Sequence, residues 1–353
     1  MQNSNPNSPT RREFLRSTAI GLVATIGRLP ENVIAADPAE SPPIRGLDVI
    51  PENLTLGDWP GRAKWAGLNS IVLHHFESPE TLLKFIKTDP GQAFLAQCAA
   101  AKIELEFDFH AMRDLVPRAL FEKKPSLFRM DKNGERTPIR NFCVHSATAL
   151  EIAGENAVRY AKAFPTTTGR YYYWSDGCAE WCRCPRCREL SDSDQLLIVE
   201  NVLLAALEHV DPMAKVAHLA CHTSMPAPTQ IKPAPGVFLQ YAPGRRRYDI
   251  PYSEQTREDQ LDSLWYLEQN LKVFPKRTAQ ALEYWVDVTH FPPGTGPLPW
   301  NRERFLADLE SYKSFGIRHV KSFANGTDAD YVKRHGEPKF IAEFAQGLKS
   351  VLG

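Results

Sequence analysis

The residues between Tyr171 and Cys187 combine a carboxylate and several thiols at close spacing. An apolar aromatic run, typical of a buried strand, ends at Asp176 and Gly177. A dense group of cysteines follows at once: Cys178, Cys182, Cys184 and Cys187. Barrel enzymes keep their catalytic residues where strands end, and clustered thiols indicate a metal or disulfides that hold a loop in place. We therefore expect a rigid active-site rim that contains Asp176.

Histidines, carboxylates and aromatic side chains also end other short apolar runs. These residues are His74, His75, Asp108, His110, His222, Tyr241, Glu283, Tyr284, Trp285 and Asp287. Each of them alone is as easily explained as a packing residue. A stable core needs few polar side chains, however, so their number at strand ends favours a functional site.

Eight short apolar runs, bounded by polar residues, glycine or proline, are typical of buried parallel strands. They cover residues 46–50, 69–75, 103–110, 171–176, 216–222, 237–241, 279–286 and 319–323, with helical patterns between them. This alternation predicts an α/β fold, a single (β/α)8 barrel at residues 37–353, with long loops after the third and fourth strands. A ninth strand-like run at 142–145 is placed in the loop after the third strand. A doubly wound sheet is the alternative fold.

The balance of charge argues against two classes of partner. The chain has 42 basic and 42 acidic residues among 353, which gives no reason to expect binding to nucleic acid or to a membrane surface. A hydrophobic content of 43% is sufficient for a core. No apolar run is long enough to span a bilayer, so we expect no membrane span in the mature protein.

The amino terminus predicts export. Paired arginines, Arg11 and Arg12, precede a weakly apolar run at 17–27 and a small-residue cleavage site at 33–35. This pattern is typical of a twin-arginine signal, so residues 1–36 are expected to be removed and the protein to be periplasmic or secreted. Such export usually carries folded proteins, which favours a metal over disulfides at the cysteines. The alternative interpretation is a cytoplasmic basic amphipathic helix.

The segment WSDG, followed by WCRCPRC and later by a Glu-Tyr-Trp strand, resembles a family of uncharacterised bacterial glycoside-hydrolase-like barrels, a domain of unknown function. Asp176, Glu283 and Tyr284 match its pattern, as do the thiols of Cys182, Cys184 and Cys187. Residues 128–146 resemble the loop that such proteins place after the third strand. The resemblance covers about residues 45–350 and implies a barrel related by fold to α-glucuronidases and hexosaminidases. It also implies a glycoside hydrolase that acts on a poly- or oligosaccharide.

Glycoside hydrolysis needs two carboxyl groups, one to protonate the leaving oxygen and one to act as nucleophile or to activate water. We expect Asp176 to be the acid/base and Glu283 to be the second carboxylate, because strands four and seven lie on opposite sides of an eight-stranded barrel. Asp287 and Asp108 are the reserve candidates. Aromatic neighbours of Asp176 would raise its pKa. The alternative is that Asp176 caps the following loop.

Carbohydrate recognition would use aromatic rings and hydrogen-bonding histidines. The candidates are His74, His75, His110, His222, Tyr241, Tyr284 and Trp285. Arg245 and Arg247 follow the sixth strand, and guanidinium groups bind carboxylates in a bidentate manner. They suggest a uronate-containing sugar, with a solvated basic turn as the alternative.

The cysteine cluster allows more than one interpretation. Cys178, Cys182, Cys184 and Cys187 have the spacing C-x3-C-x-C-x2-C, which differs from that of a zinc finger but lets four thiolates surround a structural zinc if the loop folds back. Disulfides and free thiols are the alternatives. Cys98, Cys143 and Cys221 are expected to be buried apolar residues, although any of them could replace Cys178 as the fourth ligand.

Two other functional classes stay open. A metal-dependent hydrolase of the deacetylase or amidohydrolase type could place His74, His75, Asp108, His110 and His222 around a catalytic metal. The first strand lacks the His-x-His pair that amidohydrolases carry. A sugar-binding barrel without catalysis is the third possibility.

Overall fold

The chain folds into a closed barrel of parallel strands, and the computed structural model describes residues 42–76, 78–256, 262–291 and 296–353. The strands follow one another around the barrel in chain order: β1 (Arg45–Val49), β2 (Ser70–His75), β3 (Glu104–His110), β4 (Arg170–Trp174), β5 (Lys215–Ala220), β6 (Val237–Tyr241), β7 (Gln280–Glu283) and β8 (His319–Phe323). β8 pairs with β1, with Val320 opposite Arg45, and this pairing closes the sheet. The predicted (β/α)8 barrel is confirmed, and the doubly wound alternative is wrong.

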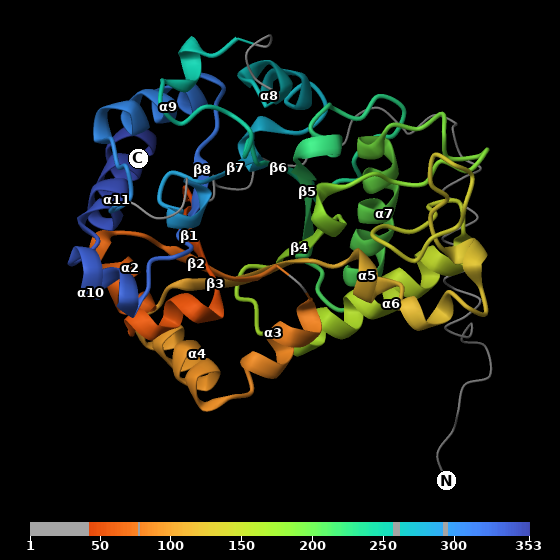
Figure 1. Ribbon diagram of the computed structural model, residues 1–353, viewed down its shortest axis with the longest axis horizontal. Coiled ribbons are helices and arrows are strands. Elements are labelled where there is room, and N and C mark those ends of the chain that lie inside the picture. Colours follow the sequence, from red (N-terminus) through yellow and green to blue (C-terminus); the bar gives the residue numbers. More distant parts are fainter. Residues whose placement is uncertain (1–41, 77, 257–261, 292–295) are drawn as a thin grey trace.

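Helices cover the outside of the barrel (Figure 1). They are α2 (Trp59–Ala66), α3 (Pro79–Phe85), α4 (Asp89–Ala101), α5 (Met112–Leu115), α6 (Ala147–Ala163), α7 (Asp192–Leu207), α8 (Leu264–Asn270), α9 (Arg302–Ser314), α10 (Ala329–His335) and α11 (Lys339–Leu352). Most begin with a polar cap: for example, the side chain of Ser146 accepts a hydrogen bond from Ala149 N at the start of α6. In the part of the chain that the structure describes, no helix combines the length and the apolar character needed to cross a membrane.

The long loops predicted after the third and fourth strands are present and pack against each other. The first runs from 111 to 146 and the second from 175 to 191. Arg183 N in the second loop donates to the carbonyl of Met130 in the first, at 2.8 Å. Within the first loop, Phe128 and Phe142 form an isolated antiparallel bridge, so the ninth strand-like run lies in this loop as expected. Together the two loops form a lobe on one side of the barrel (Figure 1, yellow to light green).

Strand alternation divides the buried residues into two sets. The larger core lies between the barrel and the helices, and a smaller one, with Tyr172, Leu282 and Phe323 among its members, fills the barrel interior. A charged layer lies inside the barrel as well, where Lys321 Nζ contacts Glu106 and donates to Tyr172 Oη at 3.0 Å. Pairing of the buried charges offsets part of the cost of removing them from water. This packed interior forms the floor of the candidate site.

Candidate active site

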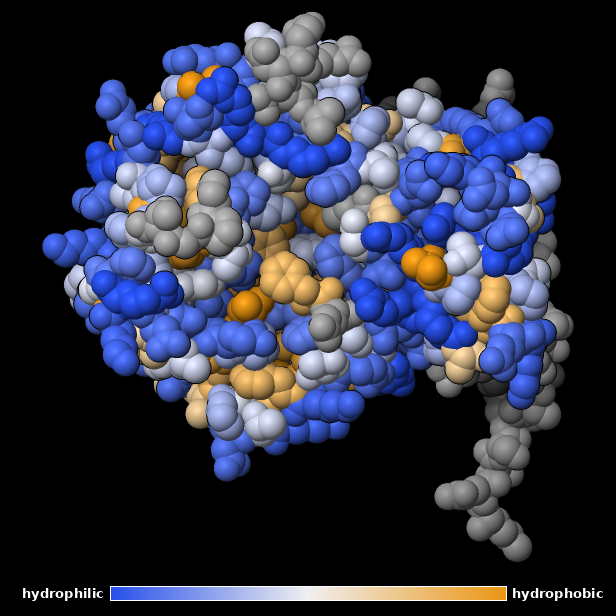
Figure 2. Space-filling model, viewed as in Figure 1, coloured by the Kyte–Doolittle hydropathy of each residue, from blue (hydrophilic) through white to orange (hydrophobic). Residues whose placement is uncertain are grey.

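A cavity of about 100 Å³ lies at the carboxyl ends of the strands, where barrel enzymes hold their substrates. Its polar lining consists of His74, His110, His222, Asp287 and Asn325, and its rings are Phe76, Trp174, Tyr284 and Phe323. A water molecule needs about 10–15 Å³ by this measure, so the cavity has room for several waters. Apolar residues gather near the centre of the face shown in Figure 2, among a mostly hydrophilic surface.

His74, which faces inward near the end of β2, is oriented by a carboxylate of β3. Its Nδ1 lies 2.6 Å from Oδ1 of Asp108, and both side chains are buried. Its Nε2 is buried with no hydrogen-bond partner among the described residues. A proton on Nδ1 that is donated to Asp108 leaves a lone pair on Nε2, so His74 can accept a proton at the cavity.

Asp48, an inward-facing residue of β1, lies behind Asp108, and the charge of Asp108 disfavours ionisation of Asp48. Neither carboxylate oxygen of Asp48 has a hydrogen-bond partner among the described residues. Burial raises the pKa of Asp108 to about 7 and raises the pKa of Asp48 well above its ordinary value. Burial therefore favours the protonated form of both carboxyl groups. Burial lowers the pKa of His74 to about 4, so its imidazole is neutral there. Asp48 was not predicted, although a charged residue within an otherwise apolar strand was a signal for it.

Asp287 is the carboxylate that lines the cavity directly. Its Oδ1 accepts hydrogen bonds from Thr289 N at 2.9 Å and from Thr289 Oγ1 at 2.6 Å. Its Oδ2 accepts a bond from Asn325 Nδ2 at 3.1 Å. Burial raises the pKa of Asp287 in spite of these donors. A buried carboxyl group with a raised pKa is suited to donate a proton.

Aromatic rings form much of the cavity wall. Trp174 is fixed by a hydrogen bond from its Nε1 to Gln240 Oε1 at 2.9 Å. Tyr284 stacks on His290, with 4.7 Å between ring centroids and 27° between planes. Phe76 is 51% exposed and stacks on Phe323. Flat apolar faces beside polar groups suit the binding of a sugar ring.

Two more histidines line the cavity as predicted. His110 Nδ1 lies 2.6 Å from the carbonyl oxygen of Ser175, which fixes its ring, and burial lowers its pKa to about 4. His222 has a φ of +43°, in the left-handed region that non-glycine residues rarely adopt. Such backbone strain is most common at functional sites. His74, His110 and His222 are therefore brought together at one cavity.

Asp176 lies beside the cavity but does not line it. Its Oδ1 accepts hydrogen bonds from Arg113 Nε at 3.1 Å and Nη2 at 3.0 Å, and Arg118 Nη2 lies 3.6 Å from Oδ2. Its backbone N donates to Asn141 Oδ1 at 2.8 Å. Two guanidinium groups thus hold the carboxylate that was expected to be the acid/base. β4 ends at Trp174, and the change of backbone direction after it turns Asp176 toward the loop after β3.

Glu283 points away from the cavity, so the predicted pairing with Asp176 is corrected. Leu282 and Tyr284 line the cavity, and strand alternation sends the side chain between them outward. There Glu283 accepts hydrogen bonds from Tyr312 Oη on α9, from Tyr248 Oη at 2.6 Å and from Arg246 Nε at 3.2 Å. The structure does not bring Asp176 and Glu283 together across one cavity.

The remaining predicted binding residues lie outside the cavity lining. His75 faces outward on β2 and accepts a bond from Ser78 N. Tyr241 and Trp285 also face outward, where Tyr241 Oη donates to Ser263 O and Trp285 Nε1 donates to Asp308 Oδ2. Each faces outward because its neighbour in the chain faces the barrel interior.

The two predicted arginines are paired with carboxylates. Arg245 binds Asp262, with 2.6 Å between Nη2 and Oδ1, and its Nη2 lies 3.5 Å from the carbonyl oxygen of His222. Arg247 binds Asp249 at the surface. Arg245 is thus near the cavity with its charge already matched, and Arg247 fits the alternative of a solvated basic turn.

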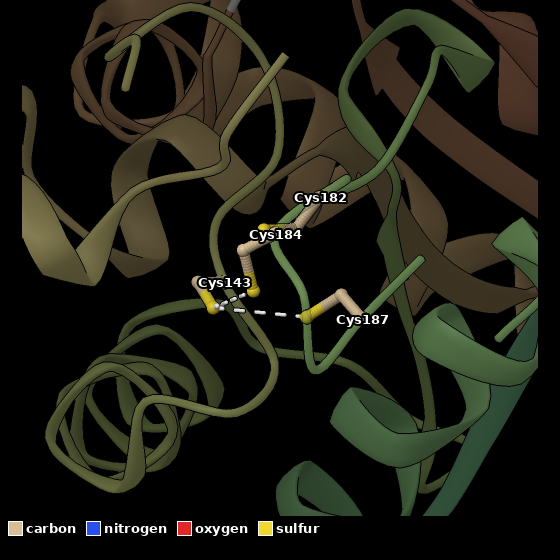
Figure 3. Close-up of side chains that lie close together, drawn as sticks. All are labelled: Cys143, Cys182, Cys184 and Cys187. Carbon is tan, nitrogen blue, oxygen red and sulfur yellow. Dashed lines mark hydrogen bonds between the residues drawn. The ribbon is translucent and has the colours of Figure 1, made fainter. Parts of the chain in front are cut away.

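Three of the four predicted cysteine ligands come together, and Cys143 joins them. The sulfur atoms of Cys143, Cys182, Cys184 and Cys187 all lie within 4.8 Å of one another, and all four side chains are buried (Figure 3). The four are free thiols, so disulfides do not explain the cluster. The side chain of Cys178 lies outside the described part of the structure. Cys143 was expected to be a buried apolar residue or a substitute for Cys178, and it is the fourth member of this thiol cluster.

A comparison with protein families identifies the chain. A family model described as Domain of unknown function (DUF4838) matches residues 83–334. The chain belongs to this family. The predicted resemblance to an uncharacterised barrel family is confirmed. No curated protein matches the sequence.

Solved structures similar to this DUF4838 protein are glycoside hydrolases. A β-galactosidase from Rahnella sp. R3 has a TM-score of 0.55 at 14% identity, over 88% of this chain and 56% of that one. A glycoside hydrolase family 5 enzyme from Prevotella bryantii B14 has a TM-score of 0.49 at 11% identity, over 86% and 95% of the two chains. A family 5 endo-β-1,4-glucanase from Bacillus licheniformis has a TM-score of 0.47 at 9% identity, over 85% and 55%. The chain spans little more than half of the β-galactosidase and of the endoglucanase. The likeness to the β-galactosidase concerns the fold alone.

The predicted metal-dependent hydrolase finds no support in this DUF4838 barrel. Among the described residues, the cysteine cluster is the one group of three or more histidine, cysteine, aspartate or glutamate side chains that could hold a metal ion. His75 faces outward, and Asp108 is engaged with His74. A catalytic metal needs three converging ligands and an open position, and the cavity histidines do not supply them.

Proposed function

We propose that the protein is a carbohydrate-active enzyme that hydrolyses a glycosidic bond in the cavity, with Asp287 as the acid and His74 as the base. The observation that carries this proposal is the convergence of Asp287 and the His74–Asp108 pair on one aromatic-walled cavity at the carboxyl end of the barrel. Asp287 and His74 both line this cavity. An acid and a base within one cavity match what glycoside hydrolysis requires.

The environment of each group indicates whether it donates or accepts a proton in the reaction. Burial raises the pKa of Asp287, which favours the protonated carboxyl group that would give its proton to the leaving glycosidic oxygen. His74 is neutral at pH 7, so its Nε2 takes a proton from the water that attacks the anomeric carbon. The imidazolium that forms is stabilised by Asp108. The bond between the anomeric carbon and the leaving oxygen breaks as the bond to water forms.

The same arrangement favours inversion of the anomeric centre. A retaining mechanism needs a second carboxylate at the sugar ring to act as nucleophile. Among the described residues that line the cavity, Asp287 is the one carboxylate, and Asp108 lies behind His74. Activation of water by His74 gives the inverted product.

The lining favours a neutral sugar over a uronate. No arginine or lysine is among the described residues that line the cavity. Arg245, the guanidinium near His222, is paired with Asp262. A uronate carboxylate would therefore meet Asp287 without a free cation to balance it.

The test is a screen of the protein against chromogenic glycosides, uronides included, with Asp287→Asn and His74→Gln as variants. Each substitution should lower turnover on the order of 100-fold or more, which is the usual contribution of general acid–base catalysis. Sugar affinity, measured by calorimetry, should change little. Asp330→Asn, an exposed aspartate on α10, is the matched control and should retain full activity.

Two results would contradict the assignment. Full turnover in Asp287→Asn would remove that residue from the reaction. Sugar binding by the unmodified protein without turnover of any glycoside would favour a sugar-binding barrel without catalysis. The presence of one carboxylate in the described lining is compatible with that function too.

A further inference from the structure

We propose that Cys143, Cys182, Cys184 and Cys187 bind one Zn²⁺ ion that cross-links the two long loops after β3 and β4. Cys143 Sγ lies 3.9 Å from Cys184 Sγ and 3.7 Å from Cys187 Sγ. In a tetrahedral zinc–thiolate centre with Zn–S bonds of about 2.3 Å, neighbouring sulfurs are about 3.8 Å apart. A disulfide would need about 2.05 Å. The spacing is that of a tetrahedral centre.

The cluster differs from a group of packing residues. Its members come from two chain segments about 40 residues apart, and each is at most 4% exposed. Cys98 on α4 shows the ordinary case: it is buried alone, and burial raises its pKa to about 12. Four free thiols in mutual contact expose reactive sulfur atoms to one another, which apolar packing does not require.

The surroundings supply positive charge and hydrogen-bond donors. Four thiolates and one Zn²⁺ carry a net charge of about −2. Arg136 Nη1 lies 3.8 Å from Cys182 Sγ, and Met130 N donates to the same sulfur at 3.3 Å. His145 Nδ1 lies 3.1 Å from Cys187 Sγ. Donors of this kind stabilise metal-bound thiolates.

Other contacts hold the ligand loop in place. Gln195, on α7, accepts a hydrogen bond from Cys182 N at 3.1 Å and donates to the carbonyl of Cys182 at 3.1 Å. Its Nε2 also lies 3.4 Å from the carbonyl oxygen of Cys187. Gln195 thus fixes the backbone at Cys182 and Cys187, two of the three cysteines that this loop contributes.

The ligand set identifies the metal class and its role. Soft thiolates select zinc and exclude Mg²⁺ and Ca²⁺, which prefer oxygen. Four protein ligands fill a tetrahedral centre, so the ion has no open position and acts as a structural element. Asn141, two residues from Cys143, accepts from Asp176 N and donates to Ala179 O. Zinc at the cluster would therefore hold the rim beside the cavity.

Metal analysis of the purified full chain tests the proposal without any glycan. We expect one zinc per chain by mass spectrometry of the elements. Protein produced with cobalt should show the visible absorption of a tetrahedral cobalt–thiolate centre. These two measurements need no variant. Absence of stoichiometric metal, or iron in place of zinc, would overturn the assignment.

Matched cysteine variants test the ligand set. Cys143→Ser should lose at least ten-fold in zinc affinity, measured by competition with a chelator, and should unfold at a lower temperature. Cys98→Ser should keep one zinc per chain, because Cys98 is buried outside the cluster. Undiminished zinc affinity in Cys143→Ser would assign the fourth position to another residue and contradict the proposal. The outcome is independent of whether Asp287 acts as an acid.

Discussion

At the scale of single residues, the environment decides which carboxylates can do chemistry. Asp176 and Asp287 both follow the end of a strand, yet Asp176 is bound by two arginines whereas Asp287 meets neutral donors. Cations stabilise the ionised form, and burial without a cation stabilises the protonated form. Burial raises the pKa of Asp287, which suits this residue to the role of an acid. Burial also raises the pKa values of Asp48 and Asp108.

The raised pKa of Asp108 predicts how stability depends on pH. The folded state holds the proton up to about pH 7, whereas the unfolded chain releases it near pH 4. The stabilisation from this proton is complete below about pH 4 and is lost as pH rises toward 7. The amide side chain introduced by Asp108→Asn is neutral at all these pH values. Measured by urea unfolding, the stability of this variant relative to the unmodified protein should rise by a few kcal/mol between pH 5 and pH 8.

The contribution of His74 to the pH dependence of stability has the opposite sign. Its main cause is burial, which is common to the unmodified protein and Asp108→Asn. The folded pKa of His74 is lowered, so its stabilisation is present above about pH 6.5 and is lost on acidification. The His74 contribution therefore largely cancels when the stabilities of these two proteins are subtracted. The control variant Asp330→Asn should show the same pH dependence as the unmodified protein. A difference between Asp108→Asn and the unmodified protein that is constant with pH would show that Asp108 has an ordinary pKa.

At the scale of elements, successive side chains of β7 point alternately to the cavity and to the helices outside the barrel. Leu282 faces the cavity, and Glu283 faces α9. Arg246 joins Glu283 to Asp308, with 2.7 Å between Arg246 Nη2 and Asp308 Oδ2, and all three side chains are buried. Removing one partner of a buried ion cluster leaves the others without compensation. Glu283 thus links β7 to α9 and stabilises the packing of this helix on the barrel.

Glu283→Gln should accordingly reduce stability and not catalysis. We expect a loss of about 3 kcal/mol in urea unfolding, because Arg246 would keep one carboxylate where it now has two. Turnover per folded molecule should stay within a few-fold. Glu310→Gln, in an exposed pair with Lys313 on α9, is the control and should change stability by less than about 0.5 kcal/mol. Unchanged stability with lost turnover would return Glu283 to a catalytic role.

At the scale of the whole molecule, a symmetrical barrel carries an asymmetrical lobe. The loops at 111–146 and 175–191 meet at the cysteine cluster and reach the cavity through Ser175 and His110. We propose a twin-arginine route for this chain from residues 1–36, and the free thiols of the cysteine cluster agree with it. These residues lie outside the part that the structure describes.

Replacing Arg11 and Arg12 together by lysine should stop export. A guanidinium fork presents paired donors that an ammonium group lacks, so recognition of the pair should fail. We expect the unmodified chain in the periplasm or the medium with a new amino terminus near Asp37, and the variant uncleaved in the cytoplasm. Arg16→Lys is the control and should be exported normally. An intact amino terminus on the unmodified chain in the cytoplasm would rule out the signal.

Much of the fold and part of the site could be predicted from local pattern. Apolar runs and helical periods follow neighbouring residues, so the barrel and its two long loops were predictable. Strand ends pointed to five residues that line the cavity: the predicted binding residues His74, His110, His222 and Tyr284, and the reserve carboxylate Asp287. Strand alternation was also in the sequence, and it could have separated His74 from His75 and Tyr284 from Glu283.

The sequence by itself therefore determined the order of strands and helices, and with it the end of the barrel where a site forms. Only the tertiary structure decided that Arg113 and Arg118 bind Asp176, that Asp48 lies behind Asp108, and that Cys143 joins the thiols of another loop. The physical reason is the range of the interactions. Backbone conformation and side-chain period depend on adjacent residues, whereas ion pairs and thiol clusters depend on segments brought together by packing.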